Sequence, residues 1–116
     1  MSDKKDLVFI RHIMDSIEAI EEFSNGLSKK ELISNRLKQS AIVREIEVIG
    51  EAAKNLSKNF KDKYNKIAWK DIIGTRDIIT HRYFGVDLDV VWNIIKEDLP
   101  KLKKYLKETE GENREL

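Results

Sequence analysis

Cysteine is absent from the sequence, which excludes disulfide bonds, thiolate nucleophiles and cysteine-based zinc sites. Proline occurs once and glycine five times in 116 residues, so few positions interrupt regular backbone structure. No apolar run approaches the roughly 18 residues that a membrane-spanning helix needs. The first twelve residues, MSDKKDLVFIRH, lack the apolar stretch of a signal peptide. We therefore expect a cytoplasmic protein that does not enter the membrane.

A large excess of charge of either sign is also missing. Lys and Arg number 22 and Asp and Glu number 21, which gives a formal net charge of +1. The molecule as a whole is therefore no polycation, and unspecific binding of nucleic acid is not implied. Any contact with RNA would need a local basic site, such as one built by pairing two chains.

Apolar residues recur at three- and four-residue steps, and this spacing predicts four long helices and no strands. Charged residues make up 37% of the chain and hydrophobic residues 41%, as is typical of amphipathic helices with solvated outer faces. The second helix has two neighbouring apolar stripes, so we expect it to be covered on more than one side. The predicted helices span about residues 4–24, 35–57, 69–84 and the segment that follows Asp87.

Turn and cap residues mark the boundaries of these helices. Gly26 is expected to end the first helix, because glycine tolerates the left-handed conformation of a C-cap. Ser28 and Glu31 have the spacing of a capping box. Residues 58–67 are interpreted as a connection, and Gly85 is expected to end the third helix.

The last helix contains Pro100, which removes a backbone donor and predicts a kink. The charged tail at residues 108–116 is expected to be frayed. A chain of this length suits a single domain, residues 1–116. Together these features predict an all-α, up-and-down four-helix bundle.

The stretch from Arg76 to Tyr83 is the most informative part of the chain for chemistry. These two residues are seven apart and share one helix face, which is otherwise largely apolar. A guanidinium on such a face must be paired or must meet a partner. His81 lies roughly 140° from Arg76 around an ideal helix, so the two converge only if the helix loosens at its end. Asp77, four residues before His81, can orient the imidazole and favour its protonated form.

Each of these residues also has a structural interpretation that the spacing leaves open. Arg76 can be a structural ion-pair partner. His81 can be a charge at a helix C-terminus, where the helix dipole favours it. Tyr83 can be a half-buried packing residue.

The sequence also indicates a role or a position for five further residues. Arg44 and Glu51 are seven apart on one helix face and either support the site through ion pairs or are purely structural. His12 is expected on the solvated surface. Trp69 and Trp92 are expected in the core, and not as platforms for stacking bases.

The sequence resembles a known family in several segments at once. Arg76-x4-His81-x-Tyr83 is similar to the R-x4-H-x-Y motif that marks HEPN domains, specifically the HepT-like toxins. Three flanking segments also resemble the family, and the similarity extends over about residues 6–105 in the expected order. These segments are residues 41–57 around Ile49-Gly50-Glu51-Ala52, residues 69–74, and residues 83–100.

The resemblance implies a bundle of HEPN type and a metal-independent endoribonuclease that needs no cofactor. It implies a homodimer in which the two motifs face one composite cleft. Arg76 would bind the scissile phosphate, which the planar fork of a guanidinium matches. His81 would act as general base on the ribose 2′-hydroxyl or as general acid on the leaving 5′ oxygen.

The resemblance also implies a partner and a modification. Such toxins belong to type VII toxin–antitoxin systems, in which a minimal nucleotidyltransferase attaches AMP to the motif tyrosine, here Tyr83. Asp77, Arg44 and Glu51 would support the site. Asp77 stands where the family commonly has Asn, and an ionised carboxylate accepts hydrogen bonds but cannot donate them.

Two alternatives from other functional classes remain open. The first is a non-catalytic HEPN module that binds a nucleotide or a nucleotidyltransferase partner. The second is a helical adaptor that dimerises, in which the motif is structural.

Overall fold

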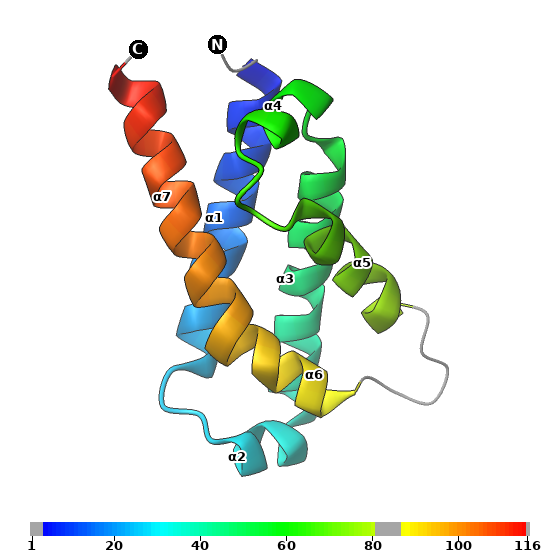
Figure 1. The fold of residues 1–116 in the computed structure, drawn as a ribbon. Helices are drawn as coiled ribbons and strands as arrows, with labels where there is room; N and C mark the ends of the chain where they lie inside the picture. Colours follow the sequence, from blue (N-terminus) through cyan, green and yellow to red (C-terminus); the bar gives the residue numbers. More distant parts are fainter. Residues whose placement is uncertain (1–3, 81–86, 116) are drawn as a thin grey trace.

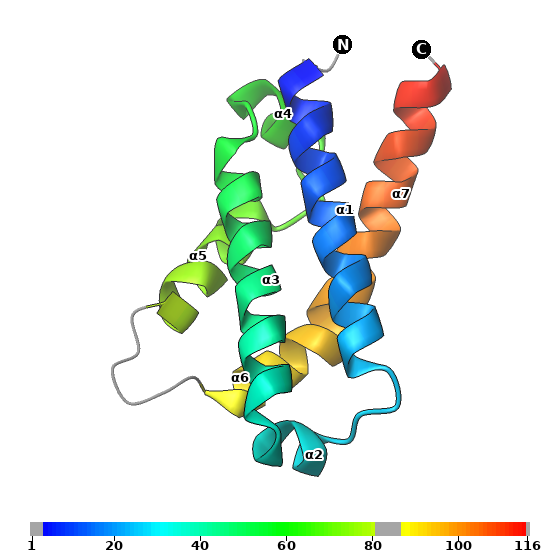
Figure 2. The same ribbon diagram turned by 180° about the vertical axis from the view of Figure 1, so that it is seen from behind.

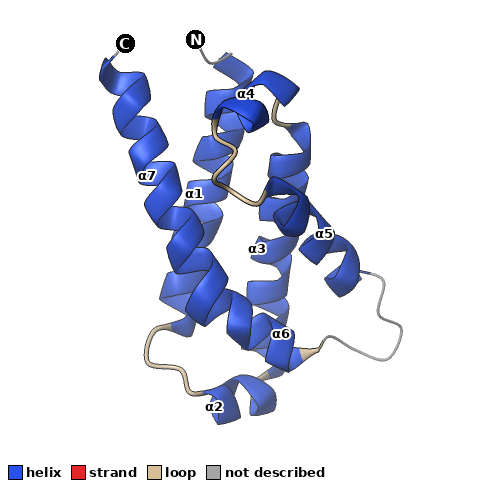
Figure 3. Cartoon of the chain, viewed as in Figure 1, coloured by secondary structure: helices blue, strands red, loops and turns tan. Residues whose placement is uncertain are grey.

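The computed structural model describes residues 4–80 and 87–115, and within 76–80 and 110–115 it describes the backbone alone. This part of the chain consists of helices and connecting loops and contains no strand (Figure 3). The predicted all-α class is therefore confirmed. In chain order the helices are α1 (Lys4–Ser24), α2 (Lys29–Ser34), α3 (Arg36–Asn55), α4 (Lys58–Lys63), α5 (Trp69–Thr80), α6 (Leu88–Asn93), the π-helix η1 (Ile94–Asp98) and α7 (Leu99–Glu115).

Four helical limbs form the bundle, as the apolar spacing predicts (Figures 1 and 2). α1 and α3 lie side by side and run in opposite directions. α6, η1 and α7 follow one another without a break and make a single limb, which packs against α1. α5 packs mainly against α3, so α3 is covered by both α1 and α5. The expected coverage of this helix on two sides is confirmed.

The hydrophobic core lies where these limbs meet, and α1 shows how it is specified. The α1 isoleucines are spaced three or four residues apart, which places them on one face of a helix. Every one of them is fully buried. Buried residues from α3 and from the last limb complete the cluster, including Ile42, Ile46, Val91, Leu102 and Leu106.

The structure confirms the helix boundaries predicted around residues 26–31, where the chain turns after α1. Gly26 has φ +71°, in the left-handed region that the C-cap requires. The Ser28 hydroxyl accepts from the Glu31 amide at 3.1 Å, and the Ser28 amide donates to the Glu31 carboxylate at 3.3 Å. Asp87 likewise accepts from the Asp89 amide at 3.0 Å and so begins α6.

Gly26→Ala and Gly74→Ala form a matched pair of stability tests. A Cβ added at either position meets nothing within 4 Å, so steric crowding does not distinguish them. Gly26→Ala should lower the free energy of unfolding by about 1 kcal/mol, because alanine is strained at this φ. Gly74→Ala should raise it by about 0.5–1 kcal/mol, because Gly74 lies inside α5. Urea denaturation measures both changes. Changes of the same sign would contradict the backbone conformations assigned to Gly26 and Gly74.

The interpretation of residues 58–67 as a connection is wrong for residues 58–63, which form α4. The Ser57 hydroxyl accepts from the Phe60 amide at 3.1 Å and caps this short helix. Phe60 is only 3% exposed and packs against the Tyr64 ring, with ring centroids 4.8 Å apart. A single buried aromatic residue and a cap hold the helix, which is too short for apolar periodicity to show it.

Asp6 forms a buried contact that helical spacing does not predict. Its carboxylate accepts from the Ser57 amide at 2.8 Å and from the Ser57 hydroxyl at 2.7 Å. Asp6 is only 2% exposed. The first turn of α1 is therefore tied to the residue that begins α4.

The distortion expected at Pro100 takes the form of a π-helical turn. Pro100 lies in the first turn of α7, directly after η1, where the Leu99 amide donates to the Ile94 carbonyl five residues back. A wider turn at this point accommodates a residue that lacks an amide donor. α7 then remains helical to Glu115, through the stretch where the sequence predicts a frayed tail.

Two further features of the described helices bear on the predictions. None of these helices is long and apolar enough to cross a membrane. α5 runs to Thr80, where this part of the described chain stops. The remainder of the predicted third helix, residues 81–84, and its expected end at Gly85 lie outside the described residues.

Candidate functional site

α5 contains Arg76, the first residue of the R-x4-H-x-Y motif, and Trp69 anchors the start of this helix. The Trp69 indole is 6% exposed and donates to the Tyr64 carbonyl at 3.2 Å, so the prediction of a core tryptophan is confirmed. Arg76 and Asp77 lie in the second half of α5. His81 and Tyr83 lie outside the described residues.

A cleft of about 290 Å³ separates α5 from η1 and α7. Its lining consists of buried side chains of α3, which we call the floor, of residues of α5 and the segment before it on one side, and of residues of η1 and α7 on the other. The wall on α5 reaches Thr75, the residue before Arg76. The cleft is lined by Ile46, Ile49, Lys66, Ile67, Ala68, Asp71, Ile72, Thr75, Ile94, Asp98, Leu99, Lys101, Leu102 and Tyr105.

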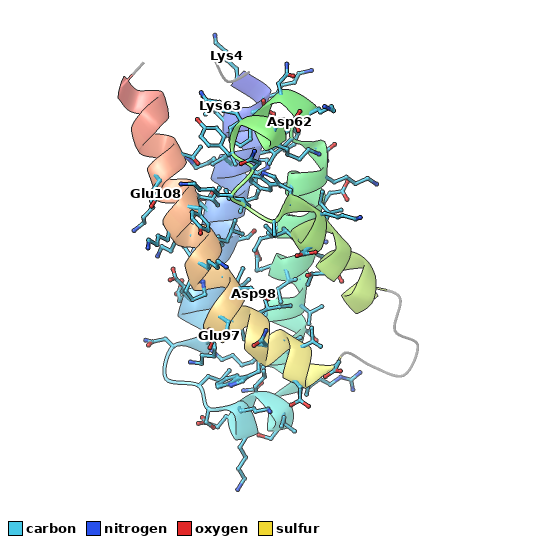
Figure 4. All side chains as sticks on the ribbon, viewed as in Figure 1. Lys4, Asp62, Lys63, Glu97, Asp98 and Glu108 are labelled. Atoms are coloured by element: carbon cyan, nitrogen blue, oxygen red, sulfur yellow. The ribbon has the colours of Figure 1, made fainter. Side chains whose placement is uncertain are left out.

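Charged groups of both signs lie at the mouth of the cleft. Asp71 on α5 and Asp98 on η1 belong to opposite walls, and Figure 4 shows Asp98 at the front of the molecule. Partial burial of the carboxyl raises the pKa of Asp98, and the negative charge of Glu97 adds to the shift. Lys101 opposes it, and the negative charge of Asp71 makes the smallest contribution. The charged form of Asp98 is therefore disfavoured mainly by burial and by Glu97, with a small repulsion from Asp71 on the opposite wall.

Asp98→Asn tests the raised pKa of this carboxyl through the pH dependence of stability. A raised pKa means that the folded state binds the proton more tightly than the unfolded chain, whose Asp pKa is near 3.8. Stability therefore falls as pH rises from about 3.8 through the folded pKa, and the loss persists at neutral pH. Asp98→Asn should raise the free energy of unfolding at pH 7 by less than about 1 kcal/mol, because solvent screens the exposed carboxylate.

The control for this measurement is Asp15→Asn, on the exposed face of α1 outside the cleft. Urea denaturation at pH 7 and at pH 3 should show the gain from Asp98→Asn at the higher pH only. A gain of equal size at both values would mean that packing, and not charge, is responsible.

A smaller hollow of about 200 Å³ continues the cleft toward α4. The cleft and the hollow share Lys66, Ile67 and Tyr105 as lining residues. Tyr64 also lines the hollow, and its buried hydroxyl makes no hydrogen bond within the described part of the chain.

Arg44 and Glu51 lie together on α3, in a shallow groove of about 300 Å³ against α1. His12 lines the same groove and is exposed, as predicted. The Arg44 side chain is 73% exposed and contacts Glu47 at 3.8 Å. This groove shares no lining residue with the cleft beside α5. A supporting role for Arg44 and Glu51 stays a prediction.

Three other side chains complete the comparison with the sequence. Trp92 is half-buried, and the Lys96 ammonium lies 4.8 Å from the centre of its ring, so the predicted core position is only partly correct. Asp71 and Asp98 were not singled out from the sequence. The available signal was weak, because Asp71 is one of many acidic residues and Asp98 lies 27 residues further along the chain.

Comparison with known proteins identifies the family. The sequence model of the family described as "Ribonuclease HepT-like" matches residues 13–109. No solved structure matches the chain.

Several curated proteins are similar to this chain. It is 39% identical to "Probable ribonuclease HepT" of Thermococcus cleftensis, over 82% of this chain and 86% of that protein. It is 36% identical to a candidate RNase of Methanocaldococcus jannaschii, over 90% of this chain and 95% of that protein.

A third relative is longer. The chain is 44% identical to a protein of Methanocaldococcus jannaschii named as a gamma-glutamylcyclotransferase and candidate RNase. The match covers 89% of this chain and spans about half, 47%, of the length of that relative. The family match and these identities together show that the chain belongs to the ribonuclease HepT-like family of the HEPN superfamily.

Proposed function

We propose that this protein is an RNA endonuclease that acts as a homodimer and uses Arg76 and His81. The observation that carries the proposal is the R-x4-H sequence that begins in the second half of α5, in a chain of the ribonuclease HepT-like family. Relatives of nearly the same length are named as ribonucleases, which supports the same activity here.

The chemistry follows from the two side chains. His81 takes the proton of the ribose 2′-hydroxyl, and the 2′ oxygen forms a bond to phosphorus while the bond to the 5′ oxygen breaks. The leaving 5′ oxygen receives a proton from a second imidazole or from water. Arg76 holds two phosphate oxygens and stabilises the negative charge that develops on them. No step in this scheme requires a metal ion.

A homodimer supplies what one chain lacks. Each protomer contributes one His81, so one imidazole can act as base while the other acts as acid. Pairing also brings together two copies of Arg76 and Arg82, which gives a local positive potential although the net charge is only +1. Within the described part of the chain α5 packs mainly on α3, which leaves other surfaces of this helix available to a second copy.

The test is cleavage of a defined RNA by the purified protein, with and without EDTA. We expect cleavage at equal rates in both samples and products that end in a 2′,3′-cyclic phosphate. Complete loss of activity in EDTA would rule out the metal-independent scheme. The mass of the protein in solution, from light scattering, should be that of a dimer.

Tyr83 is proposed as the site of neutralisation by a minimal nucleotidyltransferase. Transfer of AMP to its phenol oxygen, with release of pyrophosphate from ATP, adds a phosphodiester charge two residues from His81. That charge should repel RNA and reduce cleavage at least tenfold, the effect of about 1.4 kcal/mol. Intact-mass measurement after incubation with ATP and the partner should show added AMP on the wild type and none on Tyr83→Phe. AMP found on Tyr83→Phe would place the modification elsewhere.

One observation favours the non-catalytic alternative, a HEPN module that binds a nucleotide or a nucleotidyltransferase. Asp77 cannot donate a hydrogen bond to phosphate, as an asparagine at this position would. This alternative predicts a stable complex with the partner and no cleavage by the purified protein. The wild type separates the two: measurable cleavage that Asp77→Asn increases supports the nuclease, whereas cleavage by Asp77→Asn alone supports a wild type that Asp77 has made non-catalytic.

A further inference from the structure

We propose that the cleft between α5 and the η1–α7 limb binds the base of the nucleotide next to the scissile phosphate and prefers a base with an exocyclic amino group. This inference rests on the RNA-cleaving function proposed above. It assigns to the cleft a role in base selection, which the R-x4-H motif does not provide.

Position along α5 relates the cleft to the cleavage motif. Thr75 lines the cleft and directly precedes Arg76, a step of about 1.5 Å along the helix axis. Ile72 also lines the cleft, and Arg76 follows it by one helical turn. A phosphate held at Arg76 therefore has the entrance of the cleft beside it.

The size and lining of the cleft suit a nucleobase. Its volume of about 290 Å³ lies at the lower limit of ligand pockets, roughly 300–1,000 Å³, which favours a small planar group. The floor is apolar, with Ile46 and Ile49 buried. The half-buried Tyr105 ring in the α7 wall provides an aromatic surface, and single-stranded RNA is commonly recognised by stacking on such rings.

The charges at the mouth point to RNA with a particular base edge. Lys66 and Lys101 are exposed and can contact phosphates on either side of the base. Asp71 and Asp98 line the cleft from opposite sides, so two carboxylates face a group bound between them, and a group that donates hydrogen bonds stabilises both. Cytosine, adenine and guanine carry an amino donor, and carboxylates are suited to accept from it. Uracil presents carbonyl oxygens in place of the amino group, so it should bind least well.

The first test is the binding of single nucleotides to the full chain. NMR measures it through the chemical shifts of the Thr75, Leu102 and Tyr105 amides. CMP, AMP and GMP should shift the resonances of these amides. UMP should bind with an affinity at least about fivefold lower. Ribose 5-phosphate, which carries the sugar and phosphate without a base, is the control and should leave the Leu102 and Tyr105 amides unchanged. Equal binding of all four nucleotides, or of none, would overturn the inference.

Asp98→Asn tests the carboxylate directly, because it keeps the shape of the side chain and replaces an acceptor by a donor. The preference for CMP over UMP should shrink at least fivefold in this variant and stay unchanged in Asp15→Asn, on the exposed face of α1. Cleavage of an RNA pool should show the same change at one position beside the cut.

The outcomes separate this inference from the proposed function. Selective nucleotide binding without RNA cleavage would retain the cleft and reject the nuclease. Cleavage without base preference, unchanged by Asp98→Asn, would retain the nuclease and reject the base site. If the cleft amides shift only as protein concentration rises, a second copy of the chain occupies the cleft and the inference is wrong.

Discussion

Arg76→Ala and His81→Ala should each reduce RNA cleavage by roughly 10²–10⁴-fold, the contribution typical of a positioned acid, base or charge stabiliser. Arg76→Ala removes the group that we propose to hold the phosphate oxygens, and His81→Ala removes the group that we propose to move the proton. Initial rates on a defined RNA measure the loss. We expect expression of the wild type to arrest growth in cells, and both variants to relieve that arrest.

The chain offers a matched control for each of these substitutions. Arg11 and His12 lie next to each other on the exposed face of α1, so Arg11→Ala and His12→Ala remove the same chemical groups away from α5. Both controls should cleave RNA at close to the wild-type rate. Circular dichroism and urea denaturation should show that all four variants remain folded. Equal toxicity of folded Arg76→Ala, His81→Ala and wild type would reject the catalytic assignment.

Asp6→Ala should lower the free energy of unfolding by about 3 kcal/mol, a large fraction of the stability of a domain of this size. The substitution leaves the Ser57 amide and hydroxyl without their acceptor, and hydrogen bonds to a charged group are among the stronger ones. It also detaches the first turn of α1 from the residue that caps α4. Urea denaturation at neutral pH measures the change.

Asp15→Ala is the control for this prediction, because Asp15 lies on the exposed face of the same helix. Its effect should stay within about 0.5 kcal/mol. Ser57→Ala should lower stability as well, and the double variant should lose less than the sum of the two single losses, since both remove the same contact. Simple additivity would mean that Asp6 and Ser57 act independently.

Helical periodicity predicts the long helices well for a physical reason. A buried stripe every three or four residues is imposed by the geometry of the helix itself, so Ile10, Ile13 and Ile17 reveal α1 without knowledge of its partners. Caps are equally local. The Ser28 and Glu31 side chains bond to backbone groups three residues away, and the structure confirms them.

Features that depend on distant residues were not predictable in this way. Asp6 and Ser57 are 51 residues apart, and nothing in either neighbourhood indicates that they meet. α4 contains six residues, fewer than two turns, so it has no periodicity to detect. The cleft is a product of three limbs, and Asp71 and Asp98 are brought to its mouth only by the tertiary fold.

In the candidate site, too, local patterns could be predicted from the sequence and tertiary contacts could not. The R-x4-H motif is a local pattern, so the sequence alone named Arg76 and His81 and the family resemblance gave them roles. Arg44 and Glu51 were placed on one helix face correctly, yet their groove is separate from the cleft beside α5. Spacing along one helix shows which residues share a face but not what that face meets.

The positions of the two chain ends bear on how this domain is used in longer polypeptides. Both ends emerge at the same end of the bundle, away from the point where α5 reaches Thr80 (Figures 1 and 2). A second domain fused to either terminus would therefore begin at the opposite end of the bundle from Thr80, the last described residue of α5. The Methanocaldococcus jannaschii relative that is twice as long, and whose name combines two activities, is consistent with such modular fusion. The same geometry recommends either terminus for an affinity tag or a fluorescent reporter.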